Sequence, residues 1–95
     1  MKLFKSIDEK FAEIGFEKIE ENEFCCVYSR YEPDYCYHHL ITIGKKASGR
    51  HIIQSYDSDS PGADTVVGLT GYEMKLAIKK MKQMGLYSGK EITKL

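Results

Sequence analysis

The sequence predicts an α+β fold: a helix, three or four antiparallel strands and a second helix, with both helices on one sheet face in a two-layer sandwich. Near each end of the chain, apolar residues recur at three- and four-residue steps, which is typical of amphipathic helices. The middle is rich in aromatic and β-branched residues. A chain of 95 residues that is 42% hydrophobic and has no net charge suits one globular domain.

The first helix is expected from about Lys2 to Ile14. Its apolar residues fall on one stripe about 100° wide. They are Leu3, Phe4, Ile7, Phe11 and Ile14. Gly15 follows, and glycine readily adopts the left-handed conformation that ends many helices. Phe16 then stands where a hydrophobic residue can pack back on the helix, here on Phe11.

Four segments have the composition of strands, and turn-forming residues separate them. They are Phe16–Glu20, Phe24–Tyr31, Tyr37–Gly44 and Arg50–Asp57. The connection between the last two segments is short, so these strands should pair antiparallel. Their register stays open, because Ile43 could lie opposite either Ile52 or Ile53.

The second helix has the clearest start. Thr70 and Glu73 match a capping box, in which each side chain bonds the backbone N–H of the other residue. The apolar residues that follow fall on one side of a helix. They are Met74, Ala77, Ile78, Met81 and Met84. Gly85 is expected to end this helix. Residues 87–95 show no matching pattern, so we expect a single domain over residues 1–86 and a loose C-terminal tail.

Two helices on one side would leave the other side of the sheet open to water or to a partner. Along residues 37–43, alternate side chains should point to opposite faces. Two β-branched aliphatic residues outweigh one leucine, so we expect Ile41 and Ile43 to face the helices and Leu40 to face away. The open face is therefore the first candidate binding surface.

The second candidate surface lies on the second helix. Tyr72 and Leu76 project about 160–200° from Met74, which would form a small apolar patch able to support homodimerisation. Three lysines line one flank of the same helix, where they could contact an acidic protein or phosphates or simply be solvated. The candidate partner-binding residues are Tyr72, Lys75, Leu76, Lys79 and Lys82.

Cysteine usage indicates a reducing compartment. The chain has three cysteines, an odd number, with no apolar run of membrane-spanning length and no export signal, so free thiols and a cytoplasmic location are expected. Cys25 and Cys26 are neighbours on one strand and should point to opposite faces, which suits no shared metal ion. Neither paired zinc ligands nor a complete calcium loop is present, so we expect no metal and no cofactor.

Two segments resemble small uncharacterised proteins encoded by phages and prophages of Gram-positive bacteria. These segments are Phe11–Phe16 (FAEIGF) and Val67–Leu86 (VGLTGYEMKLAIKKMKQMGL). The resemblance implies an intracellular accessory protein that binds a host or phage factor. It assigns no functional residue.

The sequence does not name a ligand, but it orders the possible functions. With no catalytic motif, a non-enzymatic binding module is favoured, which self-associates or binds a protein through the open sheet face or the Tyr72 and Leu76 side. The first alternative is a single-stranded nucleic-acid binder that stacks bases on strand tyrosines, which the zero net charge disfavours. Its phosphate contacts would come from Lys75, Lys79 and Lys82 or from Lys45, Lys46 and Arg50. The second is a cysteine-dependent enzyme or redox sensor, which requires a thiol of low pKa.

Overall fold

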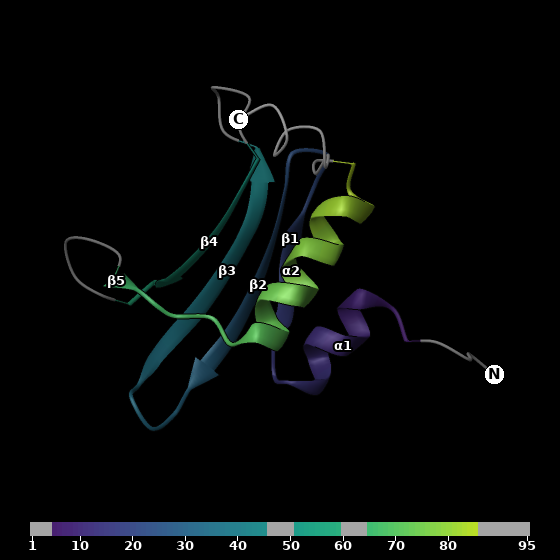
Figure 1. Cartoon of the computed structure of the whole chain (residues 1–95). Coiled ribbons are helices and arrows are strands. Elements are labelled where there is room, and N and C mark those ends of the chain that lie inside the picture. Colours follow the sequence, from purple (N-terminus) through teal and green to yellow (C-terminus); the bar gives the residue numbers. More distant parts are fainter. Residues whose placement is uncertain (1–4, 46–50, 60–64, 86–95) are drawn as a thin grey trace.

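The strands form one antiparallel sheet in chain order, β1-β2-β3-β4-β5, and both helices lie on the same side of it (Figure 1). The computed structural model describes residues 5–45, 51–59 and 65–85. The elements are α1 (Ile7–Glu13), β1 (Glu17–Glu21), β2 (Cys25–Glu32), β3 (Tyr37–Lys45), β4 (His51–Asp57), β5 (Thr65–Val66) and α2 (Gly71–Gln83). The predicted fold class is confirmed. The short strand β5 was not predicted, and the predicted tail lies outside the described residues.

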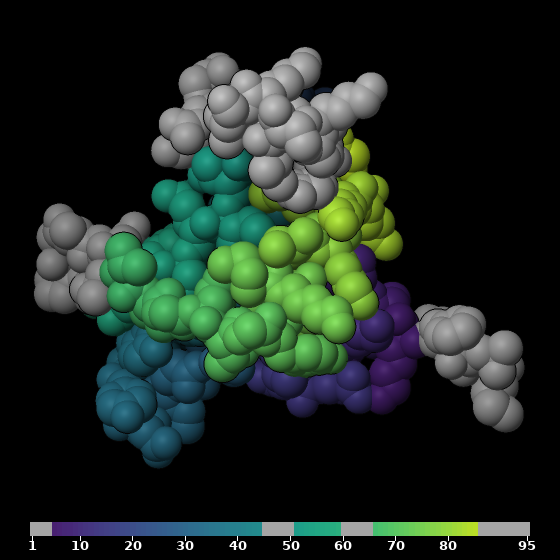
Figure 2. Space-filling view, in the orientation of Figure 1, coloured from purple at the N-terminus to yellow at the C-terminus, as the bar shows by residue number. Residues whose placement is uncertain are grey.

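The hydrophobic core lies between the helices and the sheet. Its buried members are Phe11, Phe16, Cys26, Tyr28, Ile41, Ile43, Leu76, Ala77 and Met81. Phe11 of α1 stacks on Tyr28 of β2 with ring centroids 4.0 Å apart, and the edge of Phe16 meets Phe11 at 5.7 Å. Figure 2 shows this covered side, with α2 over the middle of the sheet and α1 beside it.

The pairing of β3 with β4 answers the question that the sequence left open. Ile43 lies opposite Ile53, and Gly44 lies opposite Ile52. On the other side of β3, Ile43 lies opposite Cys26. Ile41 and Ile43 are fully buried beneath the helices, as expected from the alternation along this strand. Ile53 therefore shares the covered face, and Ile52 belongs to the opposite one.

The start of α1 differs from the prediction. The helix begins at Ile7 rather than near Lys2, because Ser6 is extended and caps it: the Ser6 hydroxyl accepts from the Glu9 backbone N–H. The Glu9 carboxylate completes the capping box by accepting from the Ser6 N–H. At the other end, Gly15 has φ +91° and the Phe16 N–H donates to the Phe11 carbonyl, as the sequence predicts.

The face that α2 buries also differs from the prediction. The capping box of Thr70 and Glu73 is confirmed, but Leu76 is 1% exposed and belongs to the core, whereas Met74 is 40% exposed. The helix is rotated relative to the predicted orientation, because Glu73 and Lys80 are both buried. A hydrophobic pattern assigns both residues to the exposed side. The predicted exposed patch of Tyr72 and Leu76 is therefore wrong.

Candidate binding surface

No helix of the described residues covers the second face of the sheet (Figure 1). Strand alternation and the register place the side chains of this open face in two complete rows across the strands. The first row consists of Glu17, Ser29, Leu40 and Tyr56, and Val66 of β5 continues it. The second row consists of Glu20, Val27, Thr42 and Gln54. Residues beyond the rows on the same face are Cys25, Tyr31, His38 and Ile52.

The open face mixes apolar and polar side chains: Val27 and Leu40 alternate with Ser29 and Thr42 on its two central strands. Val27, Leu40 and Ile52 are only half-buried there, although β2, β3 and β4 are the three inner strands of the sheet. Val66 is 85% exposed and Tyr31 is 51% exposed. Exposed apolar side chains on one side of a small domain are a candidate interaction site. The covered face, by contrast, is occupied by the helices.

Contacts between aromatic and polar side chains link neighbouring strands on the open face. The Thr42 and Tyr56 hydroxyls lie 3.3 Å apart, which joins β3 to β4. The Tyr31 and His38 rings lie 5.0 Å apart at the end of β2 and β3. Asp59 accepts from the His38 backbone N–H at 2.6 Å and lies 2.8 Å from His38 Nδ1, which lowers the pKa of its carboxyl.

Carboxylates mark the β1 margin of the open face. Glu17 and Glu20 point to this side, and Glu20 Oε2 lies 3.4 Å from Cys25 Sγ. Desolvation raises the pKa of the Cys25 thiol, and the neighbouring Glu20 carboxylate raises it further. Cys25 is therefore a neutral thiol at physiological pH, with little nucleophilic character.

On the covered side, Arg30 holds three elements together. Its guanidinium donates to the Ile14 carbonyl at 3.0 Å and to Glu32 at 2.6 Å, and it pairs with the buried Glu73 at 3.1 Å. The same group lies 4.3 Å from the Phe16 ring centroid. All of these contacts join the end of α1, β2 and the start of α2, so Arg30 has a structural role.

A second polar network lies at the opposite end of the helices. The buried Tyr28 hydroxyl donates to Asp8 at 2.5 Å, and Lys18 donates to Asp8 and to Glu21 at 2.7 Å. Lys80 of α2 reaches Glu21 at 3.2 Å. Desolvation is the main cause that raises the pKa of Tyr28, so its hydroxyl stays protonated. This network ties both helices to β1 and β2.

The closest approach to a catalytic pair is His39 with Ser55. His39 Nε2 and Ser55 Oγ lie 2.6 Å apart, and Ser55 also lines a hollow of about 400 Å³ beside β4. The buried His39 Nδ1 has no hydrogen-bond partner among the described residues. A serine hydrolase needs a group at that nitrogen to orient the ring and to stabilise the imidazolium. The pair therefore lacks the orienting member of a triad.

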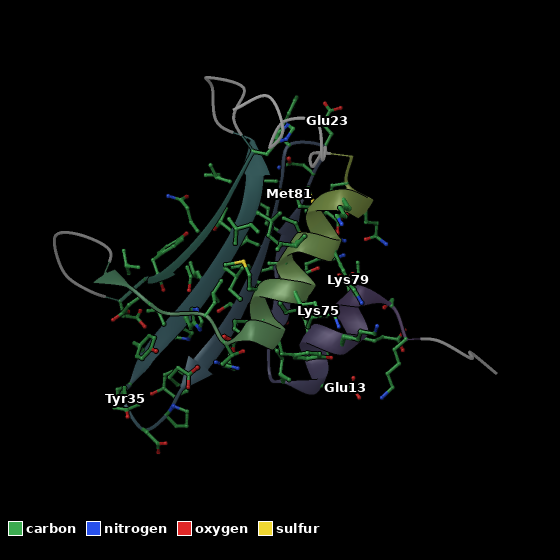
Figure 3. All side chains as sticks on the ribbon, viewed as in Figure 1. Glu13, Glu23, Tyr35, Lys75, Lys79 and Met81 are labelled. Atoms are coloured by element: carbon green, nitrogen blue, oxygen red, sulfur yellow. The ribbon has the colours of Figure 1, made fainter. Side chains whose placement is uncertain are left out.

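The structure separates the predicted partner-binding residues. Tyr72, Lys75, Lys79 and Lys82 are exposed on α2, and Leu76 is buried. Lys75 and Lys79 lie on the helix-covered side, on the flank of α2 that faces α1 (Figure 3). They therefore do not border the open face. The sequence could not predict the two rows of the open face, because the register between strands, and not any motif, brings their residues together.

The strand tyrosines are also dispersed. Tyr28 is in the core, and Tyr35 is exposed at the turn between β2 and β3, far from the helices (Figure 3). Tyr37 alternates to the covered side. Only Tyr31 and Tyr56 of the described strand tyrosines lie on the open face, which is too few for a row of base-stacking rings.

Within the part of the chain that the structure describes, no group of three metal-ligating side chains comes together. Over the same residues, no helix is long and apolar enough to cross a membrane. No protein-family model, curated protein sequence or solved structure matches this chain. The resemblance to phage and prophage proteins therefore stays a prediction.

Proposed function

We propose that this protein is a binding module that docks another protein chain on the open face of its sheet. The observation that carries this proposal is the contrast between the two faces. Both helices cover one face, while Leu40, Val27 and Ile52 are only half-buried on the other, with no described element over them. Apolar side chains gain free energy when a partner removes them from water.

A protein partner suits this surface better than a nucleic acid. Glu17, Glu20 and Asp59 border the open face, and their carboxylates would repel phosphates. The exposed Lys75 and Lys79 lie on the side of the molecule that carries the helices. A strand of nucleic acid stacked on the tyrosines of the open face could not also contact these two lysines. The charge distribution therefore favours an apolar protein surface.

A cysteine-dependent enzyme is less well supported. Burial raises the pKa of Cys26, and burial together with Glu20 raises the pKa of Cys25. Neither thiol is thus activated as a thiolate. Cys36 is exposed in the turn between β2 and β3, and no histidine hydrogen bond activates it among the described contacts.

The proposal is tested with an apolar fluorescent probe, bis-ANS, added to protein diluted until it is monomeric. Leu40→Glu places a carboxylate at the centre of the open face and should reduce the bound-probe fluorescence at least threefold. Met74→Glu is the control, because it makes a similar change at a residue that is 40% exposed and lies on α2. It should leave the fluorescence nearly unchanged, and circular dichroism should show both variants folded.

The opposite ranking would contradict the proposal. If Met74→Glu lowers the probe fluorescence and Leu40→Glu does not, the apolar binding surface lies on the helices. Probe-induced NMR shifts give an independent reading: amides of Val27, Leu40 and Thr42 should move most. Shifts confined to α1 and α2 would lead to the same rejection.

A further inference from the structure

We infer that the partner on the open face is a second copy of this chain, packed face to face about a two-fold axis that runs parallel to the strands and midway between β2 and β3. This inference rests on the proposed function, because it names the occupant of the same surface. It follows from the order of side chains along the two rows of the open face.

A two-fold axis in this direction reverses the order of the strands but keeps each row at its own height. β1 then lies over β4 of the second copy, and β2 lies over β3 of the second copy. In the second row, Glu20 meets the partner's Gln54, and Val27 meets the partner's Thr42. In the first row, Glu17 meets the partner's Tyr56, and Ser29 meets the partner's Leu40.

The chemistry of these meetings is complementary. Glu17 and Glu20 bring carboxylates, which only accept hydrogen bonds, and Tyr56 and Gln54 bring a hydroxyl and an amide that can donate. The apolar residues Val27 and Leu40 lie between them, next to the axis. From β1 to β4, each row thus has an acceptor on one outer strand and a donor on the other, which is what a two-fold pairing of identical surfaces requires.

The same pattern disfavours the other face-to-face arrangement. An axis perpendicular to the strands would place β1 over β1 of the second copy. Glu17 and Glu20 would then meet the same carboxylates of the partner. Like charges brought together at an interface act against association, so the carboxylates select the axis parallel to the strands.

The available area sets the expected affinity. Four strands at a spacing of about 4.8 Å, each with about seven residues of 3.4 Å, cover roughly 450 Å² of flat sheet. Two such faces bury about 900 Å², which is the size of weak, transient interfaces. Packed sheets lie about 10 Å apart and within about 30° of alignment, so the long side chains at the margins can still meet. A reversible dimer with a micromolar dissociation constant is therefore expected.

Sedimentation velocity over a concentration series tests the inference. Gln54→Glu opposes two pairs of carboxylates across the axis and should weaken the dimer at least tenfold. Adding Glu20→Lys to this variant turns both of these contacts into pairs of opposite charge and should restore the dissociation constant to within about threefold of the original. Gln83→Glu is the matched control, because it makes the same chemical change on α2, where Oε1 accepts from Lys80. It should leave the dimer unchanged.

Three results would overturn the inference. One is a monomer up to about 1 mM; another is a dimer that Gln54→Glu does not weaken; the third is no recovery in the double variant. Circular dichroism on each variant separates loss of the interface from loss of the fold. A monomer whose probe signal still falls with Leu40→Glu would reject only the second copy as partner. If the protein forms a dimer but Leu40→Glu leaves the probe fluorescence of the diluted monomer unchanged, the proposed surface itself is rejected.

Discussion

Leu76→Ala tests which face of α2 is buried. Leu76 is 1% exposed and belongs to the core between α2 and the sheet, so its truncation removes apolar contacts and leaves a cavity. Such substitutions cost about 2–5 kcal/mol, and we expect about 3 kcal/mol of unfolding free energy here. The unfolding entropy of a domain of this length is about 0.2 kcal/mol/K, so Tm should fall by roughly 15 °C.

The assay is urea unfolding followed by circular dichroism, with Met74→Ala as the control. Met74 lies two residues away on the same helix and is 40% exposed, so its truncation should cost less than about 1 kcal/mol. The reverse order of the two costs would refute the placement of α2. It would also restore the Tyr72 and Leu76 patch as a candidate surface.

The other predictions concern titration and thiol chemistry. Burial lowers the pKa of His39, so protonation favours the unfolded chain: the unfolding free energy should be greatest above pH 6.5 and fall as the pH drops below it. Urea midpoints at pH 8 and pH 5.5 should differ less in His39→Gln than in the unsubstituted protein, and equal differences would exclude His39 as the cause. In thiol titration with a chromogenic disulfide, the exposed Cys36 should react first and the fully buried Cys26 only on unfolding. Rapid reaction of Cys26 would contradict its place in the core.

Local signals in the sequence predicted the end of α1 and both ends of α2. The Thr70 and Glu73 capping box and the glycines after each helix depend on residues a few positions apart, so the sequence contains the whole device. The Ser6 and Glu9 box is equally local and could have been found by the same signature. The short strand β5 could not, because only pairing with β4 makes it a strand.

Signals that depend on distant partners were missed. Glu73 is buried because Arg30 lies 3.1 Å away, and Lys80 is buried because Glu21 lies 3.2 Å away. Hydrophobic periodicity treats both residues as exposed. The orientation that it predicts for α2 therefore places Met74, and not Leu76, in the core. Burial of a charge is acceptable only when a partner is in place, and no local pattern contains that partner.

The candidate surface was predictable as a face but not as a set of residues. The order of helices and strands implied one open side of the sheet. Its chemistry depends on the choice between Ile52 and Ile53 opposite Ile43, because a shift of one residue moves every side chain of β4 to the other face. With the observed register, Gln54 faces outward and lies in the row of Glu20.

The open face should be a rigid surface, because the same strands build both sides of the sheet. Val27 and Ser29 point outward between Cys26, Tyr28 and Arg30, which are held by the core and by the ion pairs with the helices. Moving an outward side chain by shifting its backbone would disturb these inward neighbours, and close-packed interiors resist such changes. A partner should therefore find the two rows already in place and cause little backbone movement on binding.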